Sequence, residues 1–125
     1  SIAPFEELMM TPDEYKDLHS NQLKQWQEIV QQSDTLLQLA HRKDWSELLS
    51  LHAKRDEMLK QFFAQAMTQD LVETVQKELK SITEQDKEIV DLVKKNQDAL
   101  STEAQQLNQM KKRINDYLSA DKNRL

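Results

Sequence analysis

The sequence has no cysteine, no glycine and only two prolines, Pro4 and Pro12. Without cysteine, the chain cannot form disulfides, use a thiol nucleophile or bind a metal through thiolates, which is usual for proteins of a reducing cytosol. Without glycine, it has no glycine-rich loop to hold a phosphate and lacks the residue that tight turns most often use. No apolar run approaches the roughly 18 residues that a membrane-spanning helix needs. We therefore expect a cytoplasmic protein with no membrane span.

Charged residues, in contrast, make up 31% of the 125 residues, and the net charge is −5. Together with the many glutamine, lysine, glutamate and leucine residues, this composition favours long helices with polar outer faces over sheets. The negative charge is concentrated in residues 1–20, where one lysine accompanies five acidic residues. An acidic start and a nearly neutral remainder argue against direct binding of nucleic acid, which depends on basic contacts to phosphates.

Two capping boxes mark the starts of helices. TPDE at 11–14 has a threonine cap, a proline at the first helical position and a glutamate three residues after the threonine. DWSE at 44–47 has the same form with an aspartate cap. Apolar residues recur at spacings of three and four after each box. The sequence therefore predicts helices over about 12–41 and 45–67.

The connection between these two helices is unusually short for a chain without glycine. It is the stretch HRKDW, which ends at Trp45, one of only two tryptophans. A connection of two or three residues forces the helices to lie antiparallel. Trp45 can then close this end of the hairpin by packing over Ala40 and Leu37, which compensates for the glycine that commonly ends a helix.

A third helix is predicted over about 70–100, with Asp70 as its cap. Its apolar stripe continues in the same helical steps through Ala104, Leu107, Lys111, Ile114 and Leu118. Thr102 opens a further capping box, so the sequence allows a break near 101–103 and a fourth helix over 103–118. It equally allows one continuous helix of about 48 residues, about 72 Å long.

These elements predict an all-α fold, an antiparallel three- to four-helix bundle with a long third helix. We expect residues 11–125 to form one helical domain and residues 1–10 to be an N-terminal segment of uncertain origin. The basic run at 111–113 is interpreted as a solvated helix face, because three adjacent residues point in different directions around a helix.

The predicted third helix carries more apolar surface than the hairpin can cover. If it is straight, residues 93–118 extend past the hairpin by about 39 Å. Their apolar stripe must fold back as a fourth helix, pair in a homodimer or bind another protein.

A second apolar surplus lies on the helix over 45–67. Leu51, Arg55, Met58 and Phe62 form a stripe beside its core face. We interpret this stripe as a partner-binding groove for an amphipathic helix, lined by adaptable methionine and aromatic side chains. A wider core or a dimer seam explains the same stripe and remains an alternative.

Counting residues along antiparallel helices places a polar set in one layer of the bundle. Its members are Ser33, His52, Arg55, Asp56 and Asp86. The layer has no nucleophile with an orienting partner, so we expect it to fix helix register and Asp86 to pair with Arg55 or His52. We expect no catalytic, cofactor or metal site, because His52 with Asp56 one turn later is the nearest approach to a metal-ligand pair.

Residues 22–62 resemble the N-terminal hairpin of the FliT family of bacterial flagellar export chaperones. The resemblance depends on Trp26 and Trp45 on either side of an LL-x-LA stretch at 36–40, followed by Arg55. The stretch KKRINDYL at 111–118 is similar to the usual ending of the family, so the resemblance covers about 22–118.

The resemblance implies a small helical bundle that binds the flagellar filament-cap protein before export and docks to the export ATPase machinery. In some members it also implies restraint of the master transcription regulator of flagellar genes, with the C-terminal helix controlling access to the partner surface. The family's partner contacts correspond here to Leu79, Ile82, Thr83, Ile89 and Val90. Two alternatives stay open: a self-associating coiled-coil protein, and a chaperone for hook-filament junction proteins.

Overall fold

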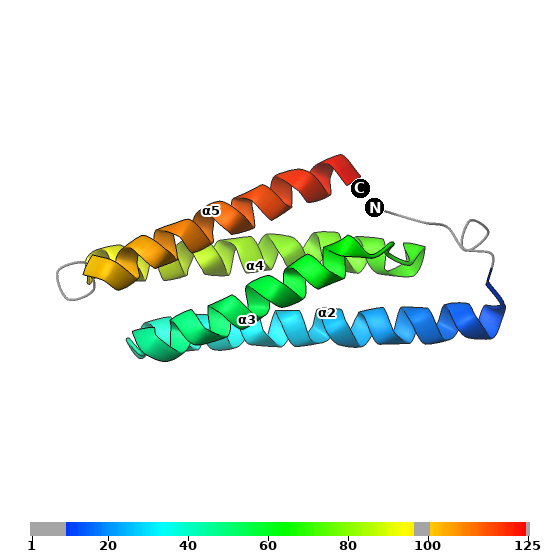
Figure 1. Ribbon diagram of the computed structural model, residues 1–125, viewed down its shortest axis with the longest axis horizontal. Coiled ribbons are helices and arrows are strands. Elements are labelled where there is room, and N and C mark those ends of the chain that lie inside the picture. The colour runs from blue at the N-terminus through cyan, green and yellow to red at the C-terminus, as the bar shows by residue number, and fades with distance from the viewer. Residues whose placement is uncertain (1–9, 97–100, 125) are drawn as a thin grey trace.

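The computed structural model describes residues 10–96 and 101–124, and the side chains of 10–96 and 105–117. The described residues form four α-helices: α2 (Pro12–His41), α3 (Trp45–Ala64), α4 (Gln69–Lys95) and α5 (Ser101–Arg124). Successive helices run in opposite directions, α2 packs on α3 and α4, and α5 packs on α4 and α3 (Figure 1). The predicted all-α antiparallel bundle is confirmed. The N-terminal segment predicted over 1–10 lies outside the described residues apart from Met10.

The third helix is shorter than the sequence predicted. It ends at Lys95 instead of about 100, and the chain then turns back as α5, so a single continuous helix is excluded. Its N-cap is Thr68 and not Asp70, which lies in the first turn. Thr102 lies inside α5 and does not cap it, since that helix begins at Ser101 and extends to Arg124, beyond both predicted limits. Helix α3 likewise ends at Ala64, three residues before its predicted end.

The two predicted capping boxes do begin helices. The Thr11 hydroxyl accepts a hydrogen bond from the Glu14 amide at 3.1 Å, and the Asp44 carboxylate accepts one from the Glu47 amide at 3.4 Å. Each bond satisfies an N–H group that the helix itself leaves free.

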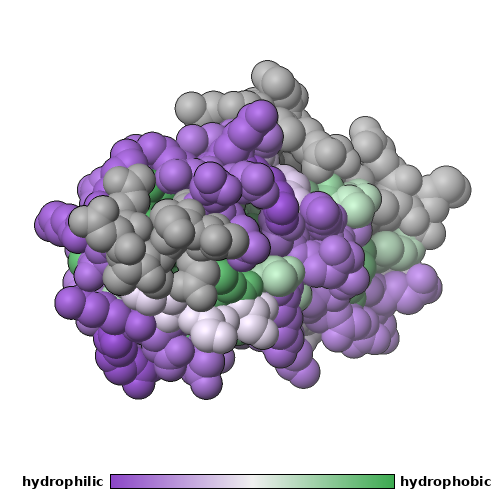
Figure 2. All heavy atoms as spheres, turned by 60° about the vertical axis from the view of Figure 1, so that its left-hand side comes forward, coloured by the Kyte–Doolittle hydropathy of each residue, from purple (hydrophilic) through white to green (hydrophobic). Residues whose placement is uncertain are grey.

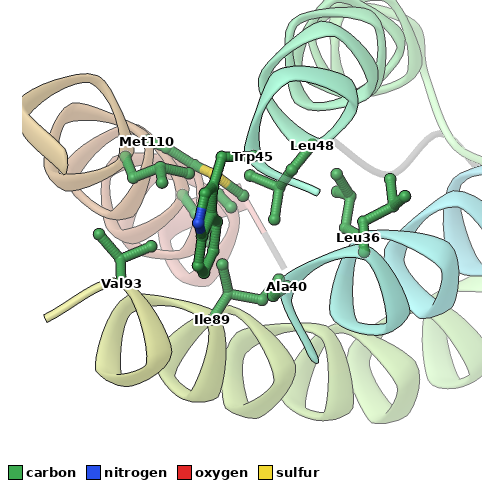
Figure 3. Close-up of a cluster of buried hydrophobic side chains, with 10 residues drawn as sticks. Leu36, Ala40, Trp45, Leu48, Ile89, Val93 and Met110 are labelled. Atoms are coloured by element: carbon green, nitrogen blue, oxygen red, sulfur yellow. The ribbon is translucent and has the colours of Figure 1, made fainter. Parts of the chain in front are cut away.

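The turn between α2 and α3 closes without glycine because Lys43 adopts a left-handed conformation, with φ of 60°. The Lys43 amide donates to the Ala40 carbonyl at 3.1 Å and the Asp44 amide donates to the Leu39 carbonyl at 3.0 Å. This pair of bonds is the Schellman motif, whose left-handed position is normally glycine. Trp45 lies over this end in one cluster with Ala40, as the sequence predicted (Figure 3).

The connection between α3 and α4 is held by a buried glutamine of α2. The Gln22 side chain is 1% exposed. It donates to the Ala66 carbonyl at 2.7 Å and accepts from the Thr68 amide at 2.9 Å. A polar residue on the apolar stripe of α2 thus satisfies backbone groups that leave helical geometry between the two helices.

Apolar side chains gather in two clusters along the bundle. The turn-end cluster lies beside the α2–α3 turn and includes residues of all four helices: Leu36, Leu39, Ala40, Trp45, Leu48, Ile89, Val93, Leu107, Met110 and Ile114 (Figure 3). The aromatic cluster lies toward the α3–α4 connection: Trp26, Ile29, Leu59, Phe62, Phe63, Met67, Leu71, Val75, Leu79 and Ile82. Its three rings pack with centroids 5.2 to 6.3 Å apart.

We expect Lys43→Gly to raise the free energy of unfolding by about 0.5 to 1 kcal/mol, because relief of the left-handed strain exceeds the entropy that glycine adds to the unfolded chain. Urea unfolding followed by circular dichroism measures the change. Lys43→Ala is the control, since it removes the same charge but keeps the Cβ atom. Equal stability of the glycine and alanine variants would contradict the assignment of strain to this residue.

Candidate partner-binding site

A buried arginine joins three helices at the middle of the bundle. Arg55 of α3 is 0% exposed, and its two terminal nitrogens donate to the two carboxylate oxygens of Asp86 on α4 at 3.0 and 3.1 Å. The first of these nitrogens also donates to the Ser33 hydroxyl of α2 at 3.1 Å. Burial raises the pKa of Asp86, and the charge of Arg55 opposes that rise. The predicted pairing of Asp86 with Arg55 is confirmed.

This polar layer separates the two apolar clusters. On α2, Ser33 lies between Ile29 of the aromatic cluster and Leu36 of the turn-end cluster. On α4, Asp86 lies between Ile82 and Ile89 in the same way. A charged pair enclosed between apolar regions loses its partner if one helix slides along another, so it favours a single register.

A second polar group lies where α5 covers α3. The Asp56 carboxylate is 4% exposed, and its Oδ2 atom accepts from Arg113 Nη1 of α5 at 3.0 Å. Lys60, one turn along α3, approaches the same oxygen at 3.7 Å. The Arg113 side chain is 50% exposed. The basic run at 111–113, interpreted from the sequence as a solvated face, therefore includes one residue that ties α5 to α3.

Some buried polar atoms of α3 make no hydrogen bond to any described residue. Within the described residues, three of its buried atoms have no hydrogen-bond partner: His52 Nε2, Arg55 Nε and Asp56 Oδ1. Burial, with the nearby charge of Arg55, lowers the pKa of His52 to about 4, so this side chain is neutral at pH 7. Burial and the Asp56 carboxylate raise the pKa of Tyr117 on α5 to about 12.

Helix α5 covers the rest of its contact surface with apolar side chains. Leu107, Met110 and Ile114 are at most 3% exposed and belong to the turn-end cluster. Met110 takes the core position that the sequence stripe had assigned to Lys111, which is half-buried. Leu118, the last member of that stripe, lies outside the described side chains. Folding back was one of three predicted outcomes for the stripe over 103–118, and it is the one observed.

The nine residues predicted to bind a partner do not form one exposed face. Three are half-buried and reach the surface: Leu51, Met58 and Thr83. Six are buried beneath neighbouring helices: Arg55, Phe62, Leu79, Ile82, Ile89 and Val90. On the face in Figure 2, hydrophilic side chains cover most of the surface and hydrophobic ones show only in patches. The buried residues can therefore meet a partner only if a covering helix moves.

The family model described as flagellar protein FliT matches residues 23–119. The chain belongs to the FliT family. The match begins within α2 and continues through α3 and α4 into α5, so it covers the hairpin, the polar layer and the covering helix of this FliT-family chaperone. No curated protein and no solved structure matches the chain. None of its described helices is long and apolar enough to cross a membrane.

We expect Asp86→Leu to lower the free energy of unfolding by about 3 to 5 kcal/mol, because it leaves the Arg55 charge buried without a counter-ion. Urea unfolding measures this loss. The matched double variant Arg55→Met with Asp86→Leu removes both charges and should recover most of the stability. An Asp86→Leu protein as stable as the wild type would contradict the role of the pair.

We expect His52 to make stability depend on pH. Its pKa is about 4 in the folded protein and has the ordinary histidine value of 6.5 in the unfolded chain, which therefore binds the proton first as the pH falls. The stability that the neutral ring contributes is complete above pH 6.5 and is lost as the pH falls toward 4. Relative to a His52→Gln control, the wild type should lose about 2 kcal/mol between pH 7 and 4.5. Parallel pH profiles of the two proteins would contradict this effect.

Proposed function

We propose that this FliT-family chain acts in the cytoplasm as an export chaperone that binds the flagellar filament-cap protein before secretion. Membership of a flagellar chaperone family is the observation that carries the proposal. The partner surface that we propose is the α3–α4 face beneath α5, where Ile89 and Leu51 pack in the turn-end cluster that α5 completes.

The packing of α5 supports a displaceable cover. Over residues 105–117, where its side chains are described, its buried apolar residues form one helical stripe, and an ion pair with α3 joins Arg113 to Asp56. Any amphipathic helix with a similar stripe could make the same contacts. Replacement of α5 would bring a partner against Ile89 and Trp45, which lie in the cluster that α5 completes.

Half-buried residues at the edge of this face provide a first contact before α5 moves. Met58 of α3 and Tyr117 of α5 both pack on the aromatic cluster, and Leu51 packs on the turn-end cluster. Methionine adapts readily to different apolar partners. We propose that a client first contacts these exposed edges and then replaces α5.

Two finer roles follow from the family and are part of the proposal. One is docking of the loaded chaperone to the export ATPase machinery. The other is restraint of the master transcription regulator of flagellar genes, a role that some family members have. Homodimerisation has less support than it had from the sequence, since Leu107 and Ile114 of the stripe that would form the seam are buried inside the bundle.

Titration of the full chain with purified filament-cap protein tests the proposal, with Kd from calorimetry and stoichiometry from light scattering. We expect a one-to-one complex. Met58→Asp should raise Kd at least about tenfold, because it places a charge in an apolar contact. Lys54→Asp, at an exposed position one turn earlier on α3, is the control and should bind as the wild type does.

Circular dichroism checks that both variants keep their helical content. Absence of binding by the wild-type chain would refute the proposal. A wild-type dimer that Met58→Asp dissociates, with no affinity for the cap protein, would favour the self-association alternative.

A further inference from the structure

The carboxylate of Asp56 uses only part of its bonding capacity in the closed bundle. Its Oδ2 atom meets Arg113 and Lys60. The carboxylate also interacts with the Tyr117 hydroxyl of α5. Its Oδ1 atom is buried and has no hydrogen-bond partner among the described residues. A buried carboxylate oxygen without a partner is costly, because it has lost water and gained nothing in exchange.

In the buried pair of Arg55 with Asp86, by comparison, both carboxylate oxygens accept a hydrogen bond. Arg55 donates to both oxygens of Asp86 from two nitrogens, at 3.0 and 3.1 Å. Arg113 reaches Asp56 through one nitrogen, and its side chain is 50% exposed. Two parallel bonds are stronger and more specific than one, so Asp56 could bind a better-placed guanidinium more tightly than it binds Arg113.

The contact between α3 and α5 leaves space beside Arg113. An open cleft of about 280 Å³ is lined by Leu49, His52, Ala53, Gln106, Gln109 and Arg113. The cleft borders the Arg113 side chain, whereas the apolar stripe of α5 is buried in the turn-end cluster. Arg113 and the apolar stripe thus occupy different parts of α5, so a helix that replaces α5 could repeat the stripe and orient its guanidinium differently.

We propose that Asp56 selects partner helices by requiring an arginine. Resting on the proposed function, in which a partner helix replaces α5, this inference adds the chemistry of that helix. The partner presents apolar side chains at the positions of Leu107, Met110 and Ile114, and an arginine at the position of Arg113. Along the partner helix, the three apolar residues lie at i, i+3 and i+7, and the arginine lies at i+6. Removal of α5 takes away Arg113 and Tyr117 and leaves Asp56 with the more distant cation of Lys60, so a helix without a cation meets an incompletely compensated charge.

Arginine fits this position better than lysine. Its planar fork matches both carboxylate oxygens, including the unpartnered Oδ1, whereas an ammonium acts as a point charge. The α5 helix of a second copy is a poorer occupant, because it would reproduce the single-nitrogen contact that α5 already makes. The asymmetry between Arg113 and Arg55 thus favours a partner protein over a swapped dimer.

The test uses full chains carrying Arg113→Gln, in which α5 no longer contacts Asp56 through a cation. Asp56→Asn in this background then removes the charge that a partner's cation would meet. It also changes the contacts of Asp56 with Lys60 and Tyr117, but that change is the same for both peptides. The first probe is purified filament-cap protein. The second is a pair of designed amphipathic helices with the apolar spacing given above and either arginine or glutamine at i+6. Circular dichroism confirms that each chain variant is folded.

We expect the arginine peptide to bind the Arg113→Gln chain about tenfold more tightly than the glutamine peptide does. The Asp56→Asn change should reduce this ratio to below about twofold. The cap protein should likewise lose about tenfold in affinity between the two chains.

Failures of the two proposals are distinguishable. Equal binding of the two peptides, with a cap protein that binds both chains alike, overturns the selection of arginine and leaves the proposed function intact. Discrimination between the peptides without binding of the cap protein supports the selection and overturns the proposed function. If neither peptide binds and the cap protein does not bind, both are overturned. Capture of the peptides only by a dimeric form of the chain also overturns the inference.

Discussion

A single buried charge constrains the rest of this bundle. Arg55 has no exposed surface, so its guanidinium must find its counter-ion and its hydrogen-bond acceptors inside the protein. Asp86 from α4 and Ser33 from α2 supply them, and both apolar clusters take their positions on either side of that contact. The alignment of three helices thus follows from electrostatics as well as from apolar packing, which alone tolerates several registers.

Features that depend on local patterns were predictable from the sequence, and those that depend on the path of the chain were not. Capping boxes and helical periodicity located the helix starts at Pro12 and Trp45. Counting residues along antiparallel helices placed Asp86 level with Arg55 and His52, and Arg55 is the partner that the structure shows. The rotation of α5 about its own axis depends on how the chain turns after Lys95, so the stripe missed Met110 and the contact of Arg113. The chain has neither glycine nor proline there, and the only sequence signal for a break was the possible capping box at Thr102.

The folded bundle buries most of the apolar surface that suggested a partner. The apolar stripe of α5 is buried in the turn-end cluster and Phe62 is buried in the aromatic cluster, so exposed apolar area no longer provides the reason. Family membership provides it instead, together with a polar seam in which three buried atoms lack partners within the described part of the chain. A covering helix that leaves polar atoms beneath it without hydrogen bonds is easier to replace than one that bonds them all.

Helix α5 contributes buried residues to the turn-end cluster, so the two ends of the bundle differ in how easily they unfold locally. Among the described side chains, three of the ten buried residues in the turn-end cluster come from α5, and none of the ten in the aromatic cluster does. Amide hydrogens of α4 near Val93 should therefore exchange with solvent through openings that detach α5 alone, while those near Val75 require the hairpin itself to separate. The end of the bundle near the α2–α3 turn can therefore open locally, while the other end opens only when the hairpin separates.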